Sequence, residues 1–193
     1  MTTRRRLSIS ERRANILEAA RDHFATTDYP DASVTDIAAA SGSSQSLVFH
    51  YFSSKAGLYA SVVEDSLRRL LEARLTATSS LDPGHPARDR IATLLAAHLD
   101  ALAMDRTLIA GAGEPEAALQ HRRAANEDLV EQLRRIIGVE DFPRHAWALR
   151  GWVGFLDHAG RQWVELGCPE DERWPLIESA LGALEGALGD WSV

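Results

Sequence analysis

The stretch SVTDIAAASGSSQSLVFHYFSSK, from Ser33 to Lys55, holds two short helix signals separated by a glycine, and it constrains the fold more than any other part of the chain. Ser33 can accept a hydrogen bond from the backbone N–H of Asp36, and Asp36 can reach back to the N–H of Ser33, as in a capping box. Gly42 can adopt the left-handed conformation that ends a helix, and Ser44 can cap the next one. The spacing predicts two helices joined by a tight turn.

The second predicted helix has an apolar face and a mixed face. Val48 and Phe52 lie four residues apart, which predicts that they pack together onto a core. The other face carries Gln45, Ser46, Leu47, Phe49, His50 and Tyr51. A helix-turn-helix of this length can place its second helix in the major groove of DNA. We therefore expect double-stranded DNA to be the partner of this surface.

Residues 16 to 63, of which this stretch is part, resemble the DNA-binding domain of the TetR family of transcriptional regulators. The positions that match the family's pattern are Ile16, Leu17, Ala19, Ala20, Phe24, Tyr29, Val34, Ile37, Ala38, Gly42, Ser44, Phe49, Tyr51, Phe52, Lys55 and Leu58. Asp28 and Ser46 stand where glycine is common, and Ser43 replaces an apolar residue. Phe49 replaces a tyrosine whose hydroxyl commonly bonds a phosphate, so that contact must be lost or supplied by a neighbour.

The predicted DNA-binding residues are Thr35, Ser44, Gln45, Ser46, Leu47, Phe49, His50, Tyr51 and Lys55. Those expected at base edges are Gln45, Ser46 and Leu47, whereas those expected at phosphates are Thr35, His50, Tyr51 and Lys55. Lys55 is the only lysine in the chain. The alternative for Lys55 is a surface charge at the start of a helix, without a role at DNA.

The net charge of −7 opposes DNA binding at first sight, because binding depends on neutralising phosphates. Its distribution removes the objection. Through Lys55 there are seven Lys and Arg against six Asp and Glu, and the rest of the chain has fourteen against twenty-two. The run Arg4 to Arg6 can form an arm that follows DNA, or it can be a solvated tail.

The remaining sequence shows helical periodicity throughout, with no strand signature. We expect a first helix over residues 8–26 and a long fourth helix from Lys55 to about Leu75. Further helices are expected over residues 87–104, 107–112, 114–137, 144–166 and 169–189. The fold class is therefore all-α, with about nine helices. The predicted domains are a three-helix DNA-binding head (1–54) and a larger helical domain (55–193), which the resemblance implies binds a ligand and dimerises.

Several classes of function lack sequence support. No apolar run is long enough for a membrane span or a signal segment, so we expect a cytoplasmic protein. The single cysteine, Cys168, excludes an internal disulfide, and neither a catalytic motif nor a metal-binding cluster of Cys and His occurs. We therefore expect no catalytic residue, cofactor or metal. An all-α ligand-binding protein or metal-dependent helical enzyme without a role at DNA remains the alternative.

A ligand cavity is expected between the helices over residues 87–104, 114–137 and 144–166. Its predicted lining is Leu95, His98, Leu102, Trp152, Phe155 and His158, which suits a small, largely hydrophobic molecule with one hydrogen-bonding group. The alternative is that these residues fill a core.

The last two helices are expected to form the interface of a homodimer, as the resemblance implies. The predicted interface residues are Trp152, Leu156, Trp163, Ile177, Leu181, Leu184 and Leu188. We expect arginine at Leu181 or Leu184 to give monomers. Two heads about 34–36 Å apart would then read a pseudo-palindromic operator. A repressor released by its ligand is the expected function.

Overall fold

A computed structural model describes residues 8–82, 84–139 and 142–189. Within these residues there are eight α-helices, one short 3₁₀ helix and no strand. In chain order they are α1 (Ile9–Phe24), α2 (Val34–Ala40), α3 (Gln45–Phe52), α4 (Lys55–Ser79), α5 (Ala87–Met104), η1 (Arg106–Leu108), α6 (Glu116–Ile137), α7 (Pro143–Glu165) and α8 (Glu170–Leu188). The predicted all-α fold is confirmed.

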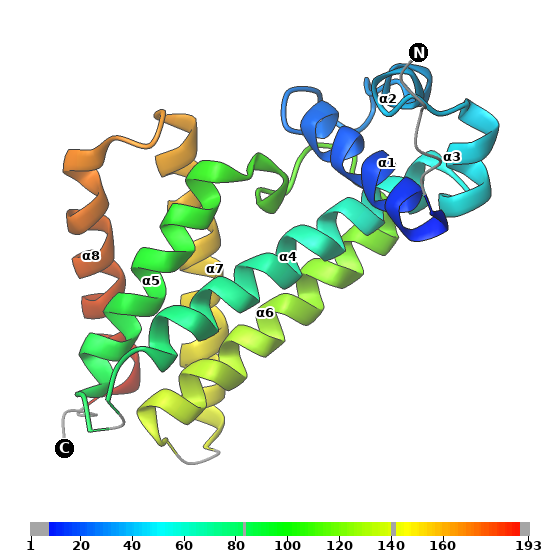
Figure 1. Ribbon diagram of the computed structural model, residues 1–193. Helices are drawn as coiled ribbons and strands as arrows, with labels where there is room; N and C mark the ends of the chain where they lie inside the picture. The colour runs from blue at the N-terminus through cyan, green and yellow to red at the C-terminus, as the bar shows by residue number, and fades with distance from the viewer. Residues whose placement is uncertain (1–7, 83, 140–141, 190–193) are drawn as a thin grey trace.

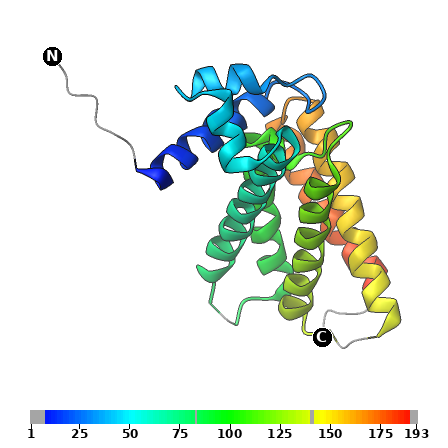
Figure 2. The same cartoon turned by 90° about the vertical axis from the view of Figure 1, so that its right-hand side faces the viewer.

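The three short helices α1, α2 and α3 form a head at one end of the molecule, and the long helices run away from it (Figures 1 and 2). Helix α4 belongs to both parts. It packs against α1 and α3 in the head and against α5, α6 and η1 in the larger domain. Its 25 residues span about 38 Å. Helix α4 therefore connects the head to the larger domain.

Two clusters of buried apolar side chains hold the molecule together. The head cluster includes Ile16, Ile37 and Val48 from the three head helices and Leu58 and Val62 from α4, all with no exposed surface. The second cluster fills the space between α5, α6, α7 and α8. The predicted boundary at residue 54 follows the helix order, but the head's core continues into the first turns of α4.

Two local predictions were wrong in detail. Ser33 accepts the Asp36 N–H at 3.3 Å as expected, but the N–H of Ser33 donates to His23 Nε2 at 3.2 Å rather than to Asp36. The Asp side chain is one methylene shorter than the Glu that usually completes a capping box, and the box in this protein lies at Ser8 and Glu11. The short helix expected over residues 107–112 is a single 3₁₀ turn at Arg106–Leu108.

Candidate DNA interface and ligand cavity

Helix α3 is held in place by its caps and by its buried face. Gly42 has φ of 61°, which a side chain with a Cβ resists, and it ends the α2 segment. Ser44 accepts the backbone N–H of Leu47 at 3.2 Å and starts α3. Val48 and Phe52 are buried against the head core. These features leave the opposite face of α3 open to a partner.

The predicted DNA-binding residues lie on α2, on α3 with its N-cap and at the start of α4, and most of them are exposed. Exposed members of the set are Thr35, Ser44, Gln45, Ser46, Phe49 and His50, and partly buried members are Leu47, Tyr51 and Lys55. The hydroxyls of Ser44 and Ser46 lie 2.9 Å apart at the start of α3. The polar groups expected at base edges are thus free of the core.

Lys55 makes contacts inside the head that the sequence did not indicate. Its Nζ donates to the carbonyl of Pro30 at 2.9 Å and lies 4.9 Å from the centre of the Tyr29 ring. Both contacts tie the turn between α1 and α2 to the start of α4. A phosphate contact by Lys55 stays a prediction, and it would compete with these internal contacts.

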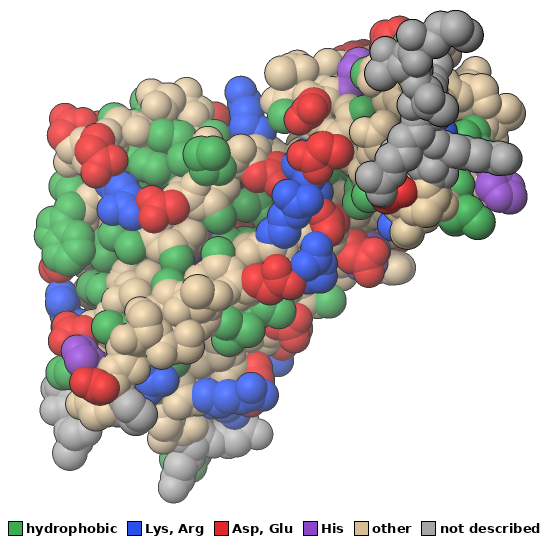
Figure 3. Space-filling view, in the orientation of Figure 1, with side chains coloured by type: hydrophobic (Ala, Val, Ile, Leu, Met, Phe, Trp, Pro, Cys, Tyr) green, Lys and Arg blue, Asp and Glu red, His purple; other side chains and the backbone are tan. Residues whose placement is uncertain are grey.

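Other cations of the head lie on α1. Arg13 is exposed, and its guanidinium carbon lies 4.9 Å from the centre of the Phe52 ring at the end of α3. Arg12 is partly exposed one residue earlier. The predicted arm at Arg4 to Arg6 lies outside the described residues. Figure 3 shows basic and acidic side chains lying side by side below the head. Ion pairs beyond the head include Arg68 with Glu72 and Arg88 with Glu178.

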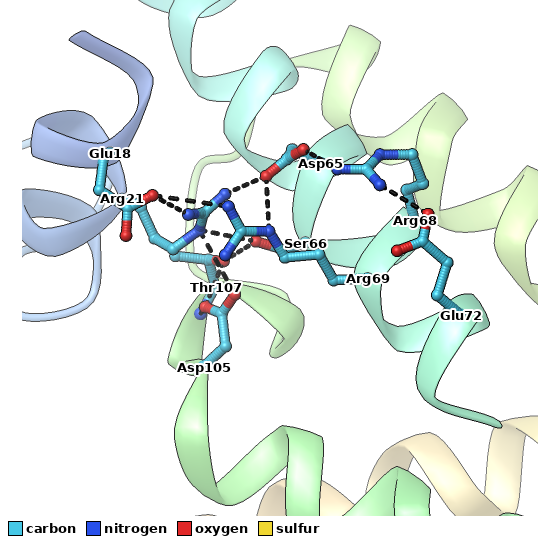
Figure 4. Close-up of polar contacts among 9 residues, drawn as sticks. All are labelled: Glu18, Arg21, Asp65, Ser66, Arg68, Arg69, Glu72, Asp105 and Thr107. Atoms are coloured by element: carbon cyan, nitrogen blue, oxygen red, sulfur yellow. Dashed lines mark hydrogen bonds and ion pairs between the residues drawn. The ribbon is translucent and has the colours of Figure 1, made fainter. Parts of the chain in front are cut away.

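A buried arginine joins the head to the larger domain. Arg21 of α1 forms ion pairs with Glu18 of its own helix and with Asp65 of α4 (Figure 4). Its Nε lies 3.5 Å from Ser66 Oγ and 3.7 Å from an oxygen of Asp105, just before η1. Arg21 is only 7% exposed, and the side chains of Asp65 and Asp105 are also mostly buried, so these two contacts are largely shielded from water. One side chain thus connects three segments that are far apart in sequence.

The partners of Arg21 are themselves fixed. Ser66 Oγ lies 2.8 Å from Thr107 Oγ1, which joins α4 to η1 directly. Burial opposes the ionisation of Asp65, but hydrogen bonding to Arg68 and the charges of Arg69, Arg21 and Arg68 hold the pKa of Asp65 below its usual value. The carboxylate is therefore charged at neutral pH, as the junction requires.

A cavity of about 90 Å³ lies among α4, α5, α6, α7 and the segment after η1. Its walls include Leu67, Leu70, Leu102 and Leu129, which are apolar. Its polar lining consists of Arg74, His98, Arg122, Asn126, Asp157 and Arg161. Three guanidinium groups against one carboxylate make the lining more basic than the sequence led us to expect.

Arg122 of α6 connects this cavity to the head. It bonds both oxygens of Glu114, at 2.7 and 2.8 Å, and donates to the carbonyls of Thr107 and Leu108. Tyr59 of α4 donates its hydroxyl to Glu114 at 2.6 Å. The Tyr59 ring packs edge-on against Phe24 of α1, with 4.8 Å between ring centres. Side chains in contact thus run from the cavity wall to the head core.

The predicted ligand-binding residues are not brought together. His98 and Leu102 line the cavity. Leu95 and Trp152 are buried in the core, where the Trp152 indole donates to the carbonyl of Ala180 at 2.7 Å. Phe155 and His158 lie on the outer surface of α7. These last four residues do not line the cavity, because Leu95 and Trp152 pack in the core and Phe155 and His158 are exposed.

The predicted dimer-interface residues lie inside a single protomer. None of the seven, Trp152, Leu156, Trp163, Ile177, Leu181, Leu184 and Leu188, exceeds 5% exposure. They pack α7 and α8 against α5 and against each other. A Leu181→Arg or Leu184→Arg change would therefore damage the protomer itself. Helices α7 and α8 carry two apolar stripes each, and periodicity alone could not assign the one that faces outward.

The outward stripe on α7 and α8 consists of small and aromatic residues. Its members are Trp147, Gly151, Gly154 and Phe155 on α7 and Trp174, Gly182, Ala183, Gly186 and Ala187 on α8. We call this surface the small-residue face. A Cβ added to any of its four glycines would meet nothing within 4 Å, whereas one added to Gly160 would lie 2.7 Å from Leu102. Packing inside the protomer therefore explains Gly160 but not the glycines of this face.

Two further features bear on the kind of site. Among the residues that the structure describes, no group of three or more His, Cys, Asp or Glu side chains is arranged to hold a metal ion. None of the described helices combines the length and apolar character needed to cross a membrane.

Comparison with known proteins agrees with this geometry. Residues 16–62 match the family model of bacterial regulatory proteins, tetR family. No curated protein matches the chain by sequence. A TetR-family transcriptional regulator from Streptomyces coelicolor is similar in structure, with 18% identity, a TM-score of 0.76, and coverage of 94% of this chain and 80% of that one.

Two regulators named FadR have the same fold. FadR from Bacillus halodurans, a fatty acid degradation regulator, has 19% identity, covers 92% of this chain and 97% of its own, and gives a TM-score of 0.72. FadR from Bacillus subtilis, solved with stearoyl-CoA, has 18% identity, coverage of 91% and 97%, and a TM-score of 0.68. Residues 16–62 thus match the model of the tetR family of bacterial regulatory proteins, and the described chain has the fold of transcriptional regulators of that family.

Proposed function

We propose that this protein is a homodimeric transcriptional repressor whose α3 helices read a pseudo-palindromic operator and whose ligand-binding cavity controls release from DNA. The observation that carries the DNA-binding part is the face of α3. Gln45, Ser46 and His50 are exposed there while Val48 and Phe52 fix the same helix to the core. A recognition helix needs this combination of a rigid back and free polar groups at its N-terminal end.

The small-residue face supports the dimer. Glycine inside a helix costs about 1 kcal/mol relative to alanine, so four of them without a packing reason in the protomer call for close approach by another helix. Trp147 is 76% exposed and Trp174 is 58% exposed beside them. A two-fold axis through this face would bury both aromatics and pair α7 and α8 with their mates.

The cavity and the junction support regulation. Arg122 lines the cavity and holds Glu114, which in turn bonds Tyr59 on α4. A ligand that moved Arg122 would disturb α4, and α4 is fixed to α1 through Arg21 and Asp65. The stearoyl-CoA bound to FadR is consistent with ligand response in this fold. A cavity of about 90 Å³ is, however, too small to enclose that molecule.

Replacing Gln45 with Ala tests whether α3 recognises the bases of the operator. An operator is first selected from a random DNA pool with the full-length protein. We expect the variant to bind it about 1–3 kcal/mol more weakly for each head and to lose preference at one base position, while the salt dependence of binding stays the same. Fluorescence anisotropy at several salt concentrations measures both effects.

The matched control for Gln45→Ala is Arg123→Met, which alters an exposed residue of α6 outside the three head helices. That variant should bind like the parent. If the random pool yields no enriched sequence, or if Gln45→Ala retains the full preference, α3 is not the recognition helix.

Replacing Gly182 with Leu tests the dimer. The new side chain enters open space in the protomer, so its helical content should be unchanged, whereas close approach of a second copy is blocked. We expect sedimentation velocity to show monomers at concentrations where the parent is dimeric. Circular dichroism checks that the helices are retained.

Ala103→Leu is the control for Gly182→Leu, because Ala103 is an exposed small residue on α5, away from the small-residue face. It should leave the dimer intact. An intact dimer in Gly182→Leu as well would place the interface elsewhere.

A further inference from the structure

The cavity contains a buried positive charge that has no partner among the described residues. Arg74 of α4 is 2% exposed, and its guanidinium makes no hydrogen bond or ion pair there. Burial lowers the pKa of Arg74 to about 10 against the opposing charges of Asp128 and Asp157, so the group remains cationic at neutral pH. A buried cation without a partner is strongly unfavourable. An anion in the cavity would remove that penalty.

The neighbour of Arg74 does not supply this anion. His98 of α5 is 5% exposed, and its Nδ1 is buried without a hydrogen-bond partner in the described structure. Burial and the charge of Arg74 lower the pKa of His98 to about 3, so the imidazole is neutral. A neutral imidazole can donate one hydrogen bond and accept another. Arg74 and His98 together thus offer three or more donors to an oxygen-bearing ligand.

The other polar groups of the lining are already occupied. Arg122 is committed to Glu114, and Arg161 donates to the carbonyl of Ala110 at 2.6 Å. Asp157 accepts from Asn126 at 2.9 Å. This carboxylate on the same cavity disfavours a ligand with two negative charges. With Glu114 offsetting Arg122, Arg74 and Arg161 face the one carboxylate of Asp157, so the lining keeps one net positive charge, and Arg74 is the guanidinium without a hydrogen bond.

We infer that the cavity binds a short aliphatic monocarboxylate, with its carboxylate on Arg74 and His98 and its carbon chain against the leucines of the wall. The planar guanidinium fork matches a carboxylate with two parallel hydrogen bonds. The volume of the cavity limits the length of the ligand's carbon chain. An apolar cavity of about 150 Å³ accommodates benzene, so 90 Å³ suits a ligand of about four to six non-hydrogen atoms. This inference names the effector class of the proposed regulator and rests on that proposal only for its effect on DNA.

The test uses acetate, propionate, butyrate and octanoate as probes on the full-length dimer, with butyramide and inorganic phosphate as comparisons. Isothermal titration calorimetry should show the tightest binding for propionate or butyrate. Butyramide has nearly the same shape without the charge and should bind about tenfold to a hundredfold more weakly. Octanoate is too long for the cavity, and phosphate lacks the apolar chain.

Arg74→Met should abolish this selectivity and should also raise the melting temperature of the ligand-free protein, because it removes the unpaired buried charge. Arg74→Gln serves as a second variant of different polarity, and Arg123→Met is the exposed control. A lower melting temperature in both Arg74 variants would make Arg74 a structural residue and overturn the inference. Equal binding of butyrate and butyramide, preference for phosphate, or no binding by any probe would overturn it as well.

Operator affinity is measured separately with and without butyrate. Selective butyrate binding that leaves operator affinity unchanged would support the carboxylate site but contradict the proposed switch. The converse outcome is that the parent binds its operator more tightly than Gln45→Ala does, while no carboxylate binds in calorimetry or changes operator affinity. That result would contradict the carboxylate site but would leave the proposed DNA recognition by α3 intact.

Discussion

Replacing Arg122 with Met is expected to lower the free energy of unfolding by about 3–5 kcal/mol at pH 7, because it leaves the buried carboxylate of Glu114 without its cation. The side chain of Glu114 is 1% exposed and that of Arg122 is 11% exposed, so water cannot replace the lost contacts. The carbonyls of Thr107 and Leu108 lose a donor at the same time. The melting temperature should fall by about 10 °C or more.

The loss of unfolding free energy in Arg122→Met should increase as the pH rises. In the parent, burial opposes ionisation of Glu114, but hydrogen bonds from Arg122, Tyr59 and the Gly111 N–H outweigh it and hold the pKa of Glu114 below its usual value. The stabilisation is therefore present above the unfolded pKa and is lost as the pH falls through the folded pKa. Without Arg122, burial dominates and the pKa of Glu114 rises, so ionisation destabilises the variant. The difference between the two proteins should grow from pH 4 to pH 7.

The double variant Glu114→Gln/Arg122→Met separates charge from packing. A neutral amide at position 114 removes the buried charge, so the double variant should be more stable at pH 7 than Arg122→Met alone and should lack its pH dependence. Urea unfolding at pH 4.5 and pH 7 measures both. An Arg122→Met variant with the stability of the parent at pH 7 would mean that the Glu114 contacts do not stabilise the fold.

Local features of the fold could be predicted because they depend on neighbours in the chain. Gly42, Ser44, Val48 and Phe52 define the turn and the buried side of α3 through positions a few residues apart. The expected bounds of α5 were confirmed at both ends, Ala87 and Met104. Helix periodicity and capping are short-range properties, so no knowledge of the tertiary structure was needed.

Contacts between distant segments could not be predicted in this way. Arg21 and Asp65 are 44 positions apart, and Tyr59 and Glu114 are 55 apart. Nothing in the spacing of these residues shows that they meet. Arg74 has the pattern of a solvated charge on an amphipathic helix. It is buried because α4 has neighbours on two sides, α5 and α6.

Replacing Gly57 with Ala is expected to abolish specific DNA binding, because this glycine sets the position of the recognition helix on α4. A Cβ at position 57 would lie 2.2 Å from the carbonyl oxygen of Phe52, the last residue of α3. That atom belongs to the backbone, so α3 would have to shift by about 1 Å relative to α4 in a close-packed head. Phe52 is 5% exposed and anchors α3, so the shift also disturbs the head core. Overpacking of this kind costs about 1–3 kcal/mol.

The consequence for DNA binding is expected to be larger than the loss of stability, because both heads of the proposed dimer would be displaced together. Affinity for the selected operator should fall towards the non-specific level, about a thousandfold or more, while the salt-dependent binding to unrelated DNA persists. Gly84→Ala is the matched control, since a Cβ there meets nothing within 4 Å and its φ is not in the left-handed region. Calorimetric binding of butyrate should be retained in Gly57→Ala, because the cavity lies away from the contact of α3 with α4. Normal operator affinity in Gly57→Ala would mean that the head tolerates this displacement, and the close α3–α4 contact would then not control recognition.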